Sequence, residues 1–179
     1  MSNTKNTNLN VAKFALECVK SVKDNNKITN DEYNTLVKKM PTLIQKNGYI
    51  STLVFNLSKK KNPHHMEVLN NIVGWNCEND KIKGLLKKDV VKNYDDLKKF
   101  KEEVKTKDKK ETSEIQEREL DILQQYIEQI TNLNQNEYRL VTKEMMILFG
   151  WIKRFSEGIL IDKGEKNEKN TYWLYKKHI

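Results

Sequence analysis

The residues that could support catalysis or metal binding are few and poorly spaced for either chemistry. The histidines are His64, His65 and His178. Neighbouring residues on a helix point about 100° apart, so the adjacent pair cannot by itself clamp a metal ion. The cysteines, Cys18 and Cys77, form no CxxC pair, and we expect two reduced thiols in helices rather than a zinc site or a disulfide. The sequence therefore predicts no metal and no cofactor.

The carboxylates and glycines give no better sign of an enzyme. Glu117, Glu119 and Asp121 alternate along an expected helix, which is typical of a solvated face rather than of an acid-base pair. The six glycines are scattered, so the usual glycine-rich nucleotide loops are excluded. We expect no catalytic residue and no small-molecule substrate.

Positive charge is the feature most suggestive of function. Lys and Arg total 33 against 25 Asp and Glu, which gives a net charge of +8 and permits an acidic partner such as nucleic acid. Helical spacing places two groups of cations opposite apolar stripes, with Gly150 inside the second group, where a partner could approach closely or a glycine is simply tolerated. The groups are Lys38, Lys39 and Lys46, and Arg139, Lys143, Lys153 and Arg154.

Length and composition predict the elements that must carry these charges. The 179 residues suit one domain, and two prolines with six glycines favour long, uninterrupted elements. We expect an all-α fold, a single compact bundle of about six helices without a β-sheet. No apolar run reaches the roughly 18 residues of a membrane span and the polar N-terminus does not look like a signal peptide, so a cytoplasmic protein without a membrane partner is expected.

Apolar periodicity and capping signals divide the first half of the chain into helices. The first is expected over about 8–24, and Thr29 with Glu32 fits a capping box that opens the second. Pro41 should bend this helix, and Gly48 can adopt the positive φ that closes it before another helix begins at once. Pro63 suits the first turn of a fourth helix.

The second half is expected to contain a weakly defined segment and two long helices. Residues 81–113 carry many lysines and predict a charged peripheral helix followed by a connector. Ser113 with Gln116 should open the next helix, and Asn134 with Glu137 the last. The helical domain is thus expected over 1–160. Residues 161–179 form a polar link and an aromatic, basic C-terminal tail, which either packs back onto the domain or stacks on bases.

Two stretches resemble a known family. KMPTLIQKNGYISTLVFNL, residues 39–57, resembles the part of the small all-helical subunit of type III-B (Cmr) CRISPR effector complexes in which a proline-containing apolar run leads to an Asn-Gly turn. EYRLVTKEMMILFGWIKRFSEGIL, residues 137–160, resembles that family's second signature, which ends in a Trp-X-Lys/Arg-Arg-Phe segment. Residues 81–113 match no part of the family pattern.

The resemblance implies a non-catalytic subunit of an antiviral ribonucleoprotein. Such a subunit would contact the backbone and other subunits of the Cmr complex, stack with copies of itself, and help hold target RNA against the CRISPR RNA. The RNA-binding candidates are then Lys38, Lys39, Lys46, Arg139, Lys143, Lys153 and Arg154. The alternative is a stand-alone nucleic-acid-binding helical regulator, which would bind one duplex sequence as a symmetric dimer.

Overall fold

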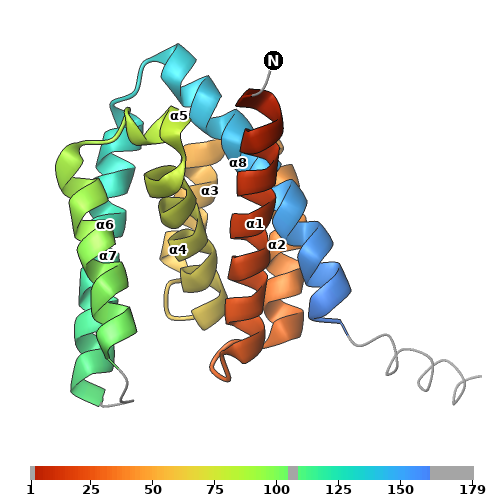
Figure 1. Ribbon diagram of the computed structural model, residues 1–179, viewed down its shortest axis with the longest axis vertical. Coiled ribbons are helices and arrows are strands. Elements are labelled where there is room, and N and C mark those ends of the chain that lie inside the picture. The colour runs from red at the N-terminus through yellow and green to blue at the C-terminus, as the bar shows by residue number, and fades with distance from the viewer. Residues whose placement is uncertain (1–2, 105–108, 162–179) are drawn as a thin grey trace, which may run out of the picture.

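The computed structural model describes residues 3–104 and 109–161, and these residues fold into helices without any strand among them (Figure 1). The all-α prediction is confirmed. The described ranges contain eight helices rather than about six. They are α1 (Asn3–Asp24), α2 (Asn30–Asn47), α3 (Tyr49–Ser58), α4 (Pro63–Glu78), α5 (Asp80–Lys83), α6 (Lys88–Glu103), α7 (Lys109–Thr131) and α8 (Gln135–Ile159).

The difference in helix number arises mainly in the charged segment 81–113. This segment contains the short helix α5, the longer helix α6 and the beginning of α7 at Lys109, where a connector was expected. Ser113 and Gln116 therefore lie inside α7, and the predicted capping box at Ser113 is wrong. Lys and Glu are good helix formers, so a polar sequence can extend a helix without any apolar stripe. The C-terminal tail lies outside the described residues, apart from residue 161.

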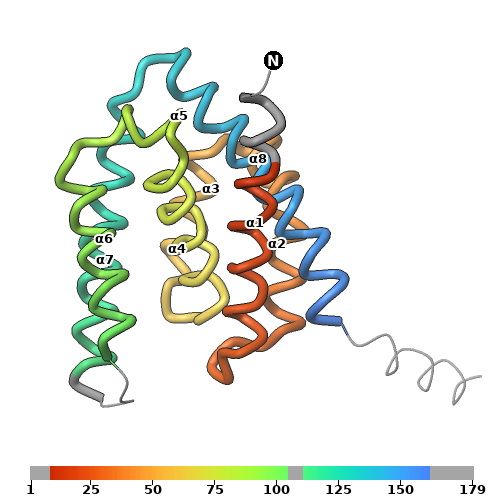
Figure 2. The backbone as a smooth tube through the Cα atoms, in the orientation of Figure 1, coloured from red at the N-terminus to blue at the C-terminus, as the bar shows by residue number. Residues whose placement is uncertain are grey.

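Helix α4 lies at the centre of the fold and contacts every other helix among those described. In Figures 1 and 2 it runs between the α6–α7 hairpin on one side and α1, α2 and α8 on the other. Residues 71–77 of α4 are all buried, as expected for a helix surrounded by others. Asn71, one of its buried polar residues, donates a hydrogen bond of 2.8 Å to the hydroxyl of Tyr33.

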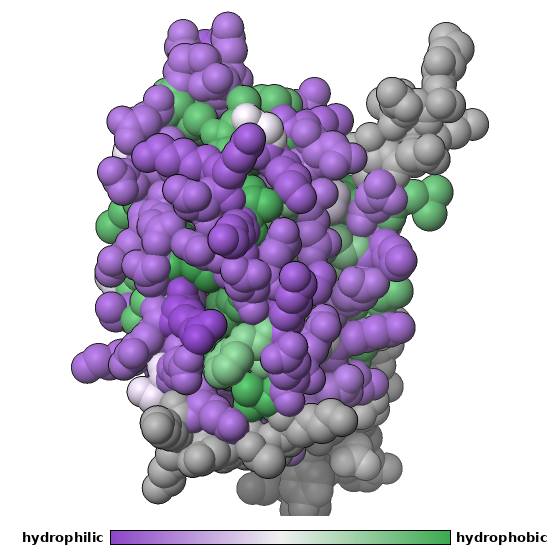
Figure 3. All heavy atoms as spheres, turned by 60° about the vertical axis from the view of Figure 1, so that its left-hand side comes forward, coloured by the Kyte–Doolittle hydropathy of each residue, from purple (hydrophilic) through white to green (hydrophobic). Residues whose placement is uncertain are grey.

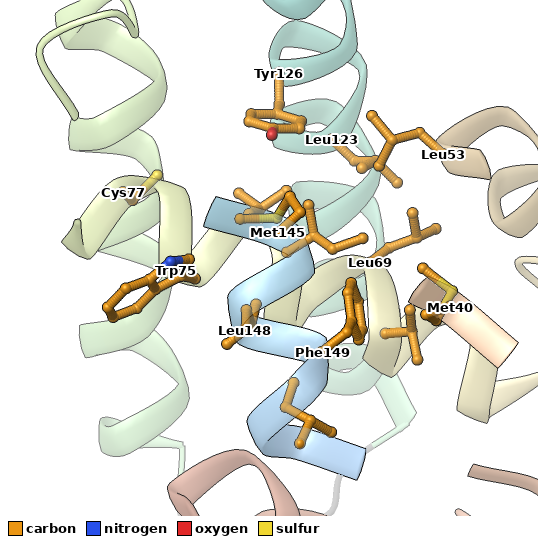
Figure 4. Packing of buried hydrophobic residues seen from close by; sticks show 14 of the residues in the cluster. Met40, Leu53, Leu69, Trp75, Cys77, Leu123, Tyr126, Met145, Leu148 and Phe149 are labelled. Atoms are coloured by element: carbon orange, nitrogen blue, oxygen red, sulfur yellow. The ribbon is translucent and has the colours of Figure 1, made fainter. Parts of the chain in front are cut away.

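The hydrophobic core joins side chains from all eight helices of the described ranges. Met40 of α2, Leu53 of α3, Leu69 of α4, Leu123 of α7 and Met145 of α8 are buried and converge in Figure 4. The stripes predicted for α2 and α8 thus face this core. None of the helices in the described ranges is both long enough and apolar enough to cross a membrane.

The joint between α2 and α3 and the start of α8 are held by specific capping interactions. Gly48 ends α2 and precedes α3 with φ 82°, the positive φ expected of it. The backbone N–H groups of Tyr49 and Ile50 donate to the hydroxyl of Tyr138 at 3.0 and 3.3 Å, so the start of α8 caps the start of α3. The capping box of Asn134 and Glu137 is confirmed.

Thr29 occupies the position before α2 as predicted, but its side chain makes no capping hydrogen bond. The capping box predicted for Thr29 and Glu32 is therefore wrong, because the hydrogen bond from the helix backbone to the Thr29 side chain is not made. The helix nevertheless begins where it was expected. Glu32 instead lies 3.4 Å from the Nδ1 atom of His64 on α4.

Candidate nucleic-acid interface

The four cations predicted on α8 form one exposed strip. Arg139, Lys143, Lys153 and Arg154, called here the cationic strip, are all exposed, and the buried residues of α8 lie on the opposite side of the helix. At a rise of 1.5 Å per residue, the 15 steps from Arg139 to Arg154 span about 22 Å. None of the four takes part in an ion pair within residues 9–104 and 111–161, so their charges are available to a partner.

Gly150 lies in the middle of the cationic strip and is not required by the fold. A Cβ atom placed on Gly150 would meet nothing within 4 Å. A glycine inside a helix costs about 1 kcal/mol relative to alanine. Packing within the described residues therefore gives no reason for a glycine at this position.

Arg154 is held in place by the neighbouring aromatic side chains. Its guanidinium carbon lies 5.2 Å from the centre of the Trp151 ring, and Trp151 stacks on Phe155 with ring centres 5.8 Å apart. A cation over an indole face is attracted by about 0.5–1 kcal/mol at an exposed site. This contact restricts the side chain without neutralising its charge.

The predicted lysines of α2 do not share one environment. Helices α2 and α8 run antiparallel, because Ser156 donates to Asn34 at 3.0 Å while Tyr138 lies at the α2–α3 joint. Lys46, exposed near the end of α2, is therefore at the same end of the pair as Arg139. Lys38 lies at the middle of α2, half-buried, with its Nζ atom 3.3 Å from a carboxylate oxygen of Glu157.

Lys39 points to a different surface from Lys38, because consecutive residues on a helix are about 100° apart. It lines a shallow groove of about 370 Å³ together with Phe55, Lys59 and the two histidines. The ammonium of Lys59 lies 4.5 Å from the centre of the Phe55 ring. Lys59 was not predicted as a site residue, since only the fold brings it beside Lys39.

The adjacent histidines behave as a structural pair. Their ring centres are 4.6 Å apart, and His65 shares a 2.8 Å hydrogen bond between its Nδ1 atom and Asn56 Oδ1. Burial, followed by the charges of His64 and Lys59, lowers the pKa of His65 to about 4, so this ring is neutral at physiological pH. In the part of the chain that the structure describes, no three His, Cys, Asp or Glu residues gather in a way that could hold a metal ion.

The expectation of a solvated carboxylate face on α7 is wrong for Glu119. This residue is buried, forms an ion pair with Lys101 of α6, and accepts a 2.9 Å hydrogen bond from Asn70 of α4. The docking of α7 against α6 and α4 explains its burial. Glu117 and Asp121 are exposed as predicted. The side of the molecule formed by α6 and α7 is otherwise mainly hydrophilic, with apolar side chains visible in narrow gaps (Figure 3).

The two cysteines are buried, unpaired thiols in α1 and α4, as expected. Burial raises the pKa of Cys18 well above its usual value, and burial raises the pKa of Cys77 to about 12. A buried thiol that resists ionisation is a poor nucleophile, so these residues serve packing.

Comparison with known proteins identifies the family. The family model for CRISPR-associated protein (Cas_Cmr5) matches residues 7–126 and 123–159, which extends from α1 to α8 and includes the segment 81–113 that the sequence motifs left unmatched. No curated protein and no solved structure matches the chain significantly. The chain belongs to the Cas_Cmr5 family, the small subunits of the type III-B CRISPR complexes.

Proposed function

We propose that this subunit is non-catalytic and that it helps hold target RNA against the CRISPR RNA during antiviral defence. The observation that supports this role most directly is the cationic strip, which is exposed, carries no intramolecular ion pair among the described residues and follows a long, well-anchored helix. In the proposed assembly, copies of the chain stack beside the backbone subunits, so that the strips of successive copies face the same RNA.

The chemistry of the strip suits contact with phosphates rather than with bases. Lysine and arginine contacts to phosphates fix the position of a strand but read no sequence. In an RNA-guided complex the sequence is read by pairing with the guide, so a protein subunit needs only geometry and charge. The bare backbone at Gly150 would allow the RNA to approach α8 closely at the centre of the strip.

The seven predicted cations do not contribute equally to this proposal. Lys46 lies at the α2–α3 end of the molecule, but it follows Lys39 by seven residues and therefore shares the side of α2 on which Lys39 lies. Lys38 would first have to leave Glu157, although a solvent-accessible surface pair of this kind is worth only about 0–1 kcal/mol. Lys39 lies on another surface and would contact a different part of the RNA or a neighbouring subunit. Family membership favours a complex subunit over the stand-alone regulator.

Cross-linking of the reconstituted complex tests the proposal. Target RNA carrying 4-thiouridine would be captured by the complex, irradiated, and the cross-linked peptides of this subunit identified by mass spectrometry. We expect cross-links in the α8 segment from Arg139 to Arg154. Cross-links confined to the other subunits would show that the strip does not contact RNA.

A further inference from the structure

A second cationic surface lies far from the strip in sequence and surrounds a groove. The groove has a volume of about 550 Å³ and lies between α7, the beginning of α4, and the turns α1–α2 and α3–α4. Lys27 comes from the first turn, and Lys60 and Lys61 come from the second. This volume is within the range of about 300–1,000 Å³ typical of small-ligand sites.

The three lysines are uncompensated. None of them forms an ion pair in the described ranges, whereas Lys98 and Lys101 on α6 do. The lining includes two carboxyl groups. Glu119 is neutralised by Lys101, and burial raises the pKa of Glu67 to about 7, so that this carboxyl is partly protonated at neutral pH. The mouth of the groove therefore favours an anion.

The rest of the lining is unlike that of a simple anion site. Its wall is largely apolar and carries three amide side chains, of which Asn25 already accepts a 3.0 Å hydrogen bond from the backbone N–H of Lys27. Gln116 makes no side-chain hydrogen bond within residues 9–104 and 111–161, and Asn70 donates to Glu119 while its amide oxygen has no partner there. The apolar residues are Ile28, Pro63, Met66, Ile115 and Leu120.

We propose that this groove binds a nucleotide, with the base against the apolar wall and the phosphate at Lys27, Lys60 and Lys61. A purely apolar ligand would leave the ammonium groups without a partner, and inorganic phosphate would make no use of the wall. The amides of Asn70 and Gln116 can both donate to and accept from the edge of a base. A free nucleotide and one nucleotide of a single-stranded RNA share this chemistry. The site is independent of the cationic strip, because it uses other elements.

Calorimetric titration of the full-length chain tests this proposal. The probes are AMP, an RNA hexamer and inorganic phosphate. One variant neutralises the mouth with Lys27→Gln, Lys60→Gln and Lys61→Gln, and another fills the groove with Gln116→Trp at an exposed position. The matched control removes the same charge from α5 and α6 with Lys83→Gln, Lys88→Gln and Lys92→Gln, three exposed lysines outside the groove.

We expect the parent and the control to bind AMP or the hexamer equally, and both groove variants to bind about tenfold more weakly or worse, as the loss of several phosphate contacts implies. Binding of AMP would identify a free nucleotide as sufficient, whereas groove-dependent binding of the hexamer alone would identify a strand as the source. Equal affinity for phosphate and AMP would overturn the proposal. So would unchanged affinity in both groove variants, or no binding of AMP and hexamer. Thermal melting of each variant verifies that the fold is intact.

Discussion

Replacing Glu67 with glutamine should stabilise the protein at alkaline pH and not at acidic pH. Glu67 lies on α4 close to Lys101 and Glu119. Burial raises its pKa from 4.5 to about 7, the charge of Lys101 opposes this rise, and the charge of Glu119 adds to it. The folded protein therefore holds this proton more tightly than the unfolded chain does. As pH rises from 4.5 through 7, the fold must accommodate an unfavourable buried charge and its stability falls.

The size of the effect follows from the two pKa values. A difference between 4.5 and about 7 corresponds to about 3 kcal/mol, at 1.36 kcal/mol for each pKa unit. This penalty is fully present above about pH 8 and is absent near pH 4, where the carboxyl is protonated in both states. Because Glu67→Gln keeps the shape and removes the charge, its gain in unfolding free energy should approach this amount at pH 8.5 and vanish at pH 4.

Urea unfolding of the parent and of Glu67→Gln at pH 4, 6 and 8.5 measures this difference directly. Glu117→Gln is the control, an exposed carboxylate on α7 whose removal should change the unfolding free energy by less than about 0.5 kcal/mol. If Glu67→Gln destabilised the protein at pH 8.5, the carboxylate would be a favourable ion partner of Lys101, and the assignment of burial as the dominant cause would be refuted.

Replacement by alanine should stabilise the protein at Gly150 and destabilise it at Gly74. Gly150→Ala should raise the unfolding free energy by about 1 kcal/mol and weaken RNA capture by the complex. Gly158→Ala, where a Cβ atom is equally free of contacts but lies near the end of α8, should leave RNA capture unchanged. Equal RNA capture by both variants would argue against close approach of RNA at Gly150. Gly74→Ala should lower the melting temperature, because its Cβ would lie 2.6 Å from the hydroxyl oxygen of Tyr94, and overpacking costs about 1–3 kcal/mol. Adding Tyr94→Phe should restore part of the loss, and a neutral Gly74→Ala would contradict this packing.

The fold class could be predicted from sequence because the long helices carry apolar stripes. In α8 the steps of three and four residues specify one buried face, and the opposite side then places Arg139 and Lys143 in solvent without knowledge of the neighbours. The capping box at Asn134 could be predicted for the same reason, since its hydrogen bonds are local.

Features that depend on contacts between distant residues could not be predicted in this way. The ion pair of Lys38 with Glu157 joins α2 to α8, and the burial of Glu119 depends on α6 and α4 docking against α7. The groove at Lys27 and Lys60 combines two turns that are separate in sequence. The start of α7 could not be predicted from the sequence, because its first turns are polar and have the composition of a connector between helices.

The salt dependence of target-RNA binding by the reconstituted complex tests the cationic strip most directly. For single strands, the slope of log K against log salt concentration is about −0.7 for each phosphate contact. Replacing Arg139, Lys143, Lys153 and Arg154 by glutamine in this subunit should make the slope less steep by about 3 for each copy that contacts the RNA. The control replaces four exposed lysines of α5 and α6, Lys83, Lys88, Lys92 and Lys99, and should leave the slope unchanged. An unchanged slope in the strip variant would contradict the proposed contact.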